Sequence, residues 1–195
     1  MTKVVAFNGS PRDGGNTSIL IGEILDELRE AGIETEEVQI GRGRVKRGCT
    51  ACMKCFENRD SRCVFDDDIV NSCIVKMREA DGIILGSPVY FLDITAEMKG
   101  LIDRAGLVSM ANNDLYRKKV GAVVTAVRRA GGSNTLDSML HFLLFSKMVV
   151  AGAPVLGVGR NIGDVRNDAE GMQRARETGQ TLAWLLRSLE KAKDS

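Results

Sequence analysis

No stretch of this 195-residue chain stays apolar for the roughly 18 to 20 residues that a membrane-spanning helix needs. The apolar run at residues 4–7 is too short for a secretion signal, and no small-residue cleavage site follows it. An excess of one charge is also missing, because 27 Lys and Arg residues face 26 Asp and Glu residues. We therefore expect a soluble, cytoplasmic protein that binds neither membranes nor nucleic acid.

Cysteine is too scarce, at five residues, for a small secreted protein held together by disulfide bonds, and an odd number cannot all pair. Internal repeats and low-complexity linkers are lacking as well. What the chain does have is 44% hydrophobic residues, over a length that suits one domain. We expect a single domain over residues 1–195 with its own hydrophobic core.

Short aliphatic runs alternate with longer segments of helical period, which is typical of parallel strands joined by crossover helices. Strands are predicted at residues 4–7, 34–40, 82–86, 120–126 and 149–156. The second of these runs alternates apolar with polar residues, so it is expected at a sheet edge. The pattern predicts a doubly wound α/β sheet, flavodoxin-like or Rossmann-like, with helices on both faces.

A glycine-rich loop, residues 8–18, leads from the first strand into an amphipathic helix. Its glycines allow backbone N–H groups to converge on one point, and the helix N-terminus adds positive potential. Neither G-x-G-x-x-G nor G-x-x-x-x-G-K-[ST] is present, which excludes the dinucleotide fingerprint and the nucleoside-triphosphate loop. The loop therefore favours a terminal phosphate group. The alternative is an ordinary turn in which Asn16 or Thr17 caps the helix.

Two motifs resemble the NAD(P)H-dependent FMN reductase-like group of flavodoxin-fold proteins, and the order of elements agrees over most of the chain. The motifs are Gly9-Ser10-Pro11-Arg12-x-Gly14-x-Asn16-Thr17 and Gly86-Ser87-Pro88-Val89-Tyr90-Phe91. The resemblance implies a flavodoxin-like, five-stranded parallel sheet in the order 2-1-3-4-5 that binds FMN. The loop residues that it assigns to the FMN phosphate are Ser10, Arg12, Asn16, Thr17 and Ser18.

The loop after the third strand contains Pro88, Val89, Tyr90 and Phe91. In the implied order the third strand neighbours the first, so this loop should flank the same crevice. Tyr90 and Phe91 offer flat faces to a ring system. Their alternative is burial in the core or against a helix.

The fourth strand leads into a third loop, which contains Arg128, Arg129 and Gly131. The resemblance places this loop at the pyrimidine side of the flavin, where one arginine would favour the negative charge that develops on reduction. The alternative is a solvated basic turn before a helix capped by Ser133 or Asn134.

Four of the five cysteines fall in an insert after the second strand, residues 41–65, which has no clear apolar period. They are spaced as Cys49-x2-Cys52-x2-Cys55-x7-Cys63. Three thiols at three-residue steps and a fourth from farther along are typical of [4Fe–4S] ligation. A structural zinc site usually divides its ligands into two separated pairs. Zinc, free redox-active thiols and a loop without metal stay open as alternatives.

The insert is basic, with seven cationic and two acidic residues between positions 41 and 63. Such cations would lower thiol pKa values and offset the charge of a thiolate-ligated cluster, unless the loop is simply solvated. Together with Cys63-Val64-Phe65-Asp66-Asp67-Asp68, the insert resembles the iron–sulfur flavoproteins of the same group. This resemblance implies that Cys49, Cys52, Cys55 and Cys63 are cluster ligands. The fifth cysteine, Cys73, and the single histidine, His141, are expected to be structural.

The resemblance implies a redox flavoprotein in which FMN and a [4Fe–4S] cluster exchange electrons. Ferredoxin or NAD(P)H is the implied donor and a small molecule the other partner, with no catalytic acid or base in the chain. A homodimer or homotetramer is also implied, in which residues near 98–110 of a partner complete the FMN site. Two other functions stay open: a non-enzymatic electron carrier like flavodoxin, and a zinc-stabilised binding module.

Overall fold

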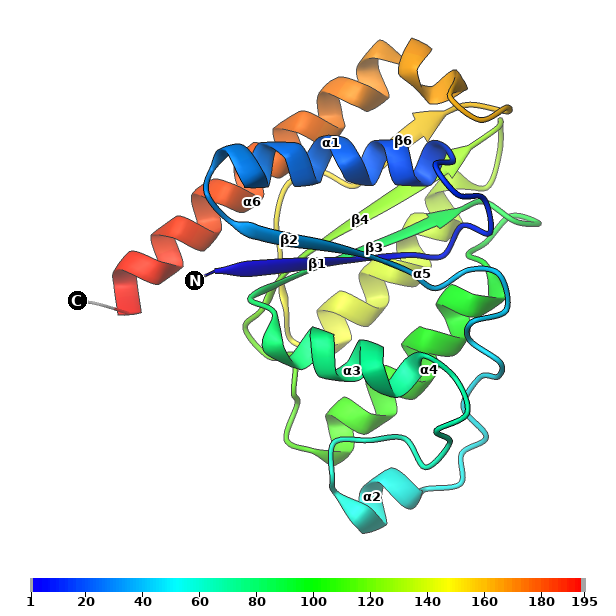
Figure 1. The fold of residues 1–195 in the computed structure, drawn as a ribbon, viewed down its shortest axis with the longest axis vertical. Helices are drawn as coiled ribbons and strands as arrows, with labels where there is room; N and C mark the ends of the chain where they lie inside the picture. Colours follow the sequence, from blue (N-terminus) through cyan, green and yellow to red (C-terminus); the bar gives the residue numbers. More distant parts are fainter. Residues whose placement is uncertain (1, 194–195) are drawn as a thin grey trace.

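The computed structural model describes residues 2–193 (Figure 1). The strands are β1 (Lys3–Asn8), β2 (Glu34–Gln39), β3 (Gly82–Pro88), β4 (Val120–Val127), β5 (Val149–Val150) and β6 (Val155–Val158). The helices are α1 (Asn16–Glu30), α2 (Lys54–Asn58), α3 (Val70–Glu79), α4 (Ala96–Ala111), α5 (Gly132–Phe145), the 3-10 helix η1 (Asp164–Asn167) and α6 (Ala169–Lys193). No helix in residues 2–193 is long and apolar enough to cross a membrane.

The strands form one parallel sheet in the order β2-β1-β3-β4-β5, and β6 also pairs with β4. This order confirms the flavodoxin-like prediction and the edge position of the second strand. The predicted fifth strand, however, is divided into two segments. Val150 and Val155 are five positions apart, whereas their partners Gly121 and Val124 are three apart. The surplus residues bulge away from β4, and they include Pro154, which has no N–H to donate.

Helices cover both faces of the sheet, as predicted (Figure 1). On one face α1 and α6 bury residues at three- and four-residue spacing, such as Ile21, Ile24 and Leu28. On the other face lie α3, α4 and α5. Cys73 of α3 is fully buried there, as predicted, and burial raises the pKa of its thiol to about 12. Its role is therefore that of a small core residue.

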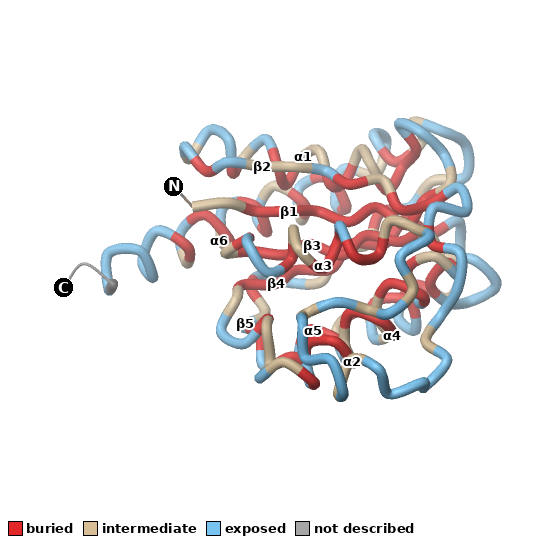
Figure 2. Tube along the Cα trace, turned by 60° about the horizontal axis from the view of Figure 1, so that its bottom comes forward, coloured by how far each residue is buried: buried red, intermediate tan, exposed pale blue. Residues whose placement is uncertain are grey.

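The cysteine-rich insert lies outside the α3 and α4 layer, and α2 is its only helix among the described residues. Figure 2 shows the strands β1, β3 and β4 buried along most of their length, whereas the chain around α2 is largely exposed. One residue of the insert, Val45, is buried in the core. It meets α4 closely, since a β-carbon at Gly100 would lie 2.8 Å from Val45 Cγ1. The insert is thus packed onto α4.

Candidate functional site

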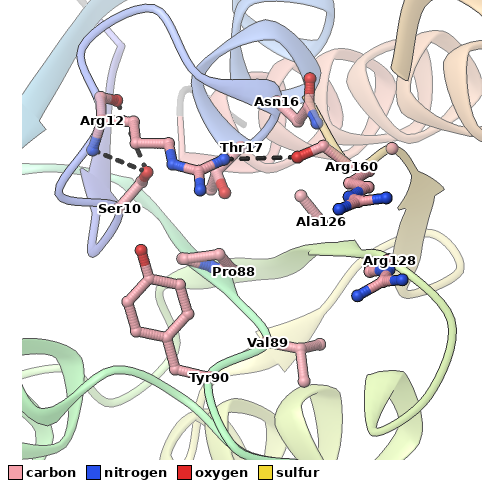
Figure 3. Close-up of a pocket in the computed structure, with 11 residues that line it drawn as sticks. Ser10, Arg12, Asn16, Thr17, Pro88, Val89, Tyr90, Ala126, Arg128 and Arg160 are labelled. Carbon is pink, nitrogen blue, oxygen red and sulfur yellow. Dashed lines mark hydrogen bonds between the residues drawn. The ribbon is translucent and has the colours of Figure 1, made fainter. Parts of the chain in front are cut away.

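A pocket of about 270 Å³ opens where β1, β3, β4 and β6 end (Figure 3). Parallel strands place their carboxyl ends at one edge of a sheet, so loops far apart in the sequence meet there. Eleven of the described residues line the pocket: Ser10, Arg12, Asn16, Thr17, Pro88, Val89, Tyr90, Ala126, Arg128, Gly159 and Arg160. The structure therefore brings together eight of the residues that were expected to bind FMN.

The turn at Ser10 is fixed by its own hydrogen bonds. The Ser10 N–H donates to Asn8 Oδ1 at 2.9 Å, and Ser10 Oγ accepts the Arg12 N–H at 3.1 Å (Figure 3). Gly41, at the end of the second strand, allows this close approach, because a β-carbon there would lie 2.2 Å from the Ser10 carbonyl oxygen. Contacts within the chain therefore hold the glycine-rich loop in this conformation.

Helix α1 begins without a side-chain cap. Gly15 is its N-cap residue, and both Asn16 and Thr17 lie inside the helix, so the alternative in which one of them caps it is wrong. The first N–H groups of a helix have no acceptor within it. Asn16 and Thr17 line the pocket, so the positive end of the helix meets this space. The arrangement suits a phosphate group.

The side chain of Asn16 draws a fourth loop to the pocket. Its Nδ2 donates to the carbonyl of Asn161 at 2.9 Å, and its Oδ1 accepts the Gly163 N–H at 2.9 Å. These bonds hold the segment between β6 and η1 beside α1, with Gly159 and Arg160 at the pocket. Sequence reasoning missed both residues, although the end of the last parallel strand was a signal that pointed to this edge.

Two of the expected residues in the loop after β3 behave differently. The chain turns sharply here: the Tyr90 N–H donates to the Asp93 carbonyl at 2.8 Å, and the Asp93 N–H returns a bond to Tyr90 at 3.2 Å. Phe91 and Leu92 take the left-handed φ values of 46° and 73° that such a turn requires. Tyr90 lines the pocket, whereas Phe91 is fully exposed. The alternative in which these aromatics are buried in the core is wrong.

Four of the expected residues, namely Ser18, Phe91, Arg129 and Gly131, are outside the lining of the pocket. Ser18 Oγ donates to the Glu37 carboxylate at 2.9 Å. Gly131, with a φ of 89°, is the N-cap of α5, so the alternative in which Ser133 or Asn134 caps this helix is wrong. A β-carbon at Gly131 would lie 2.7 Å from Leu92 Cα, so this glycine lets two pocket loops touch.

Arginine dominates the charge of the pocket. Arg12, Arg128 and Arg160 line it, and its described lining contains no acidic residue. Arg12 Nη1 reaches across to the Arg160 carbonyl at 3.4 Å (Figure 3). None of the three arginines forms an ion pair within residues 2–193. Their charge is therefore uncompensated and available to an anion.

The four cysteines of the insert surround a second, smaller pocket. Its described lining comprises Cys49, Thr50, Cys52, Met53, Cys55, Cys63, Val64, Phe65, Arg104, Leu107 and Val108. Cys52 is exposed, and the other three thiols are half-buried. Cys49 Sγ accepts the Ala51 N–H at 3.3 Å. The structure therefore gathers all four predicted ligands, which are donors that suit thiophilic metals.

One buried arginine on α4 ties this pocket to the core. Arg104 donates from Nη1 to the Asp68 carboxylate, and both side chains are fully buried. Its Nη2 donates to the Phe65 carbonyl at 2.8 Å, and its Nε donates to Cys63 Sγ at 3.3 Å. Burial works against the charge on Asp68, but the hydrogen bonds from Arg104 and from backbone N–H groups hold the Asp68 pKa below its ordinary value.

Most cations of the insert are paired with acids. The pairs include Arg42–Asp13 at 2.7 Å, Arg47–Asp67 at 2.6 Å, Lys54–Glu57 at 2.6 Å and Arg62–Asp66 at 2.9 Å. Five of the seven cations counted in the sequence are therefore paired, with Asp13, Glu57, Asp66 and Asp67 as their partners. For Cys55, the prediction that nearby cations lower the pKa is wrong. Burial, followed by the neighbouring thiols Cys49 and Cys52, raises it.

Single-ion metal sites are not formed in the described residues. No group of three or more His, Cys, Asp or Glu side chains within residues 2–193 is arranged to hold one metal ion. His141 is exposed on α5 and lines neither the pocket at the strand ends nor the cysteine pocket. Nothing in its surroundings suggests catalysis.

Comparison with known proteins decides the family. Residues 2–162 match the family model described as NADPH-dependent FMN reductase. The chain belongs to this family. An iron-sulfur flavoprotein of Methanocaldococcus jannaschii is 38% identical over 97% of this chain and 100% of its own length. Another, of Methanosarcina thermophila, is 35% identical over 98% and 99%.

Comparison with solved structures supports the fold. A flavodoxin from the domain Archaea superposes with a TM-score of 0.61 at 16% identity, covering 95% of this chain and 99% of its own. The two resemblances found in the sequence are thus confirmed. As a member of the FMN reductase family, the protein is an FMN-dependent flavoprotein of the oxidoreductase class.

Proposed function

We propose that the protein is an oxidoreductase that passes electrons between a reductant, FMN and a [4Fe–4S] cluster. The observation that carries this proposal is that one chain has two pockets lined by different chemical groups. One pocket joins a helix N-terminus to unpaired arginines, and the other is lined by four thiols. The names of the two archaeal relatives, which are iron-sulfur flavoproteins, support it.

The larger of these two pockets offers suitable groups both for the phosphate of FMN and for its ring. We propose that Ser10, Arg12, Thr17 and the first N–H groups of α1 bind the phosphate, while the side chain of Asn16 keeps the loop after β6 in place. The residues proposed for the ring are Pro88, Val89, Tyr90, Ala126 and Arg128. Ser18, Phe91, Arg129 and Gly131 lie outside the lining, so we do not propose them as FMN contacts.

FMN, when bound, supplies the redox chemistry, since it exchanges electrons singly or in pairs. The work of the chain is to bind and orient it. Pro88 would restrict the backbone at the end of β3, and Tyr90 would offer a flat aromatic face to the bound FMN. Arg128 favours the reduced, more negative flavin over the oxidised one. No residue of the described lining carries a carboxylate or an imidazole, so we propose no catalytic acid or base.

The cysteine pocket fits a cluster better than a single zinc ion. All four thiols line it, and three of them are spaced at three-residue steps along the chain. A structural zinc site usually divides its ligands into two separated pairs, whereas such closely spaced thiols are typical of [4Fe–4S] ligation. We therefore propose Cys49, Cys52, Cys55 and Cys63 as cluster ligands, one for each iron.

We propose that ferredoxin or NAD(P)H is the electron donor, that a small molecule is the other redox partner and that the protein works in the cytoplasm as a homodimer or homotetramer. Exposed apolar side chains support the assembly: Met110 and Phe145 line a groove between α4 and α5, and Leu144, next to Phe145 in the chain, is also exposed. Light scattering at micromolar concentration tests it, and a monomer would contradict it.

Anaerobic purification tests the cofactors directly. We expect flavin absorption bands, about one FMN, and about four irons and four sulfides per chain. Cys52→Ser should lose iron and sulfide but keep FMN, and Cys73→Ala, the matched control in the core, should keep all three. Flavin without iron would refute the cluster half of the proposal. Turnover of a small-molecule acceptor then separates an enzyme from a carrier like flavodoxin.

A further inference from the structure

Arg104 is the largest fully buried side chain of the described residues, and it is charged. A buried guanidinium is costly unless every N–H group has an acceptor. The ion pair with Asp68 and the bond to the Phe65 carbonyl would already anchor it. A third donor, Nε–H, is aimed at Cys63 Sγ at 3.3 Å. The acceptor of that N–H group is therefore a sulfur atom of the cysteine pocket.

The contact is specific to one of the four thiols. Cys63 is separated from the other three in the sequence and comes from the segment that Asp68 and Phe65 hold against α4. Asn71 of α3 secures the same segment, since it accepts the Cys63 N–H at 2.8 Å and donates to the Cys63 carbonyl at 2.9 Å. Both the backbone and the sulfur of Cys63 are therefore held by buried residues outside the insert.

Helix α4 is also bonded to residues that adjoin the FMN pocket, since Gly9 and Ser87 are next to the lining residues Ser10 and Pro88. At its N-cap, Thr95 Oγ1 donates to the Gly9 carbonyl at 3.0 Å, and the Thr95 N–H donates to Ser87 Oγ at 3.0 Å. Arg104 lies nine residues farther along the helix, roughly 14 Å at the rise of an α-helix. A single rigid element thus fixes the position of Cys63 relative to the glycine-rich loop.

We propose that Arg104 is the positioning residue for the Cys63 ligand and that its N–H···S bond raises the reduction potential of the group bound in the cysteine pocket. The inference rests on the cluster of the proposed function. A donor aimed at a ligand sulfur, and a buried cation behind it, stabilise the state that carries the additional negative charge. Asp68 and the Phe65 carbonyl hold the guanidinium in this orientation.

The test is the midpoint potential of the cluster, followed by electron paramagnetic resonance during an anaerobic redox titration. Arg104→Lys keeps a cation for Asp68 but loses the planar fork that reaches three acceptors. We expect it to retain iron, sulfide and FMN while its reduction equilibrium becomes up to about tenfold less favourable, a shift of 59 mV for one electron. A purely structural ion pair would leave the potential unchanged.

Arg62→Met is the matched control. Arg62 precedes Cys63 in the chain, but it is exposed and pairs with Asp66, so solvent and salt screen its charge. We expect its potential to move less than half as far as that of Arg104→Lys. If Arg104→Lys fails to fold, the potential is measured in the double variant Arg104→Met, Asp68→Asn. This variant removes both buried charges together and so leaves neither uncompensated. This variant should bind the cluster at a lower potential.

The outcomes distinguish the two proposals. A wild-type protein without iron and sulfide refutes the proposed function itself. Two results would overturn only the role of Arg104 in a wild-type protein that holds a cluster. In one, the Arg104 variant that folds has the same potential as the wild type. In the other, Arg62→Met shifts the potential as far as that variant does. A lower potential in the Arg104 variant with normal iron content supports it.

Discussion

The arginines of the two pockets are used in opposite ways. At the strand ends, Arg12, Arg128 and Arg160 line a pocket and form no ion pair within residues 2–193. Around the cysteines, arginines such as Arg62 and Arg104 are engaged by aspartates. Unpaired cations remain available to a ligand, whereas paired ones stabilise the chain. Arginine therefore indicates a ligand-binding role in the first region and a structural role in the second.

The largest effect is expected from breaking the buried pair. Arg104→Met leaves the buried Asp68 carboxylate with backbone N–H partners but without a compensating charge, which should lower the free energy of unfolding by about 3–5 kcal/mol. Chemical denaturation of the cofactor-free protein measures this. Arg62→Met breaks an exposed pair and should change the stability little. Equal losses in the two variants would contradict the contrast between buried and exposed pairs.

The next largest effect concerns the unpaired region. Arg12→Ala removes a charge-assisted partner of the phosphate, so FMN should bind about 10- to 100-fold more weakly, as fluorescence titration would show. Riboflavin, which has no phosphate, should bind equally well to both proteins. Arg42→Ala is the neighbouring control, because Arg42 is already paired with Asp13. A similar loss of FMN affinity in Arg42→Ala would show that FMN binding depends on the overall positive charge and not on whether an arginine is unpaired.

A substitution at Gly159 tests whether the loop after β6, which sequence reasoning missed, belongs to the FMN site. A β-carbon at Gly159 would lie 2.6 Å from Asn16 Nδ2 and 2.8 Å from the Val165 N. Gly159→Ala should therefore cost about 1–3 kcal/mol of stability and weaken FMN binding. Gly22→Ala, on α1 with open space around it, should stabilise the protein slightly. Unchanged FMN affinity in Gly159→Ala would remove this loop from the site.

The smallest effect separates the two arginines after β4. Arg128 lines the pocket and Arg129 does not, and both are exposed. Arg128→Ala should make reduction of bound FMN less favourable by about fivefold or less, because solvent screens an exposed charge. Arg129→Ala should leave the flavin potential unchanged. Spectroelectrochemical titration measures both, and an equal shift in the two variants would contradict the assignment.

Periodicity was enough to predict the sheet. Strands buried on both faces are almost continuously apolar, so β1, β3 and β4 could be located from composition alone. The last strand was predicted as one run because valines and a leucine stand at both of its ends, although Ala151-Gly152-Ala153-Pro154 separates them. Its division depends on the pairing with β4, where Val150 and Val155 meet partners only three positions apart. Register between strands is not encoded in the pattern of one strand.

Local signals also decided most of the candidate site. The glycine-rich loop, the loop with Tyr90 and the spacing of the four cysteines are contiguous motifs, and the structure brings each to a pocket. Phe91 was expected to face the ligand with Tyr90 but is exposed to solvent, because it lies at the tip of the turn that joins Tyr90 to Asp93. A motif names the residues of a loop, whereas the turn geometry decides which of them face the ligand.

The sequence by itself determined the fold class, the glycine-rich loop of the candidate site and the four candidate thiol ligands, because each depends on residues that are close along the chain. Tertiary structure alone decided which charges are free. Arg104 lies 36 positions from Asp68 and 41 from Cys63, and Arg160 reaches the pocket through Asn16. Net charge cannot reveal such pairings, since the energy of a charge depends on burial and on its nearest partner, and both are set by packing.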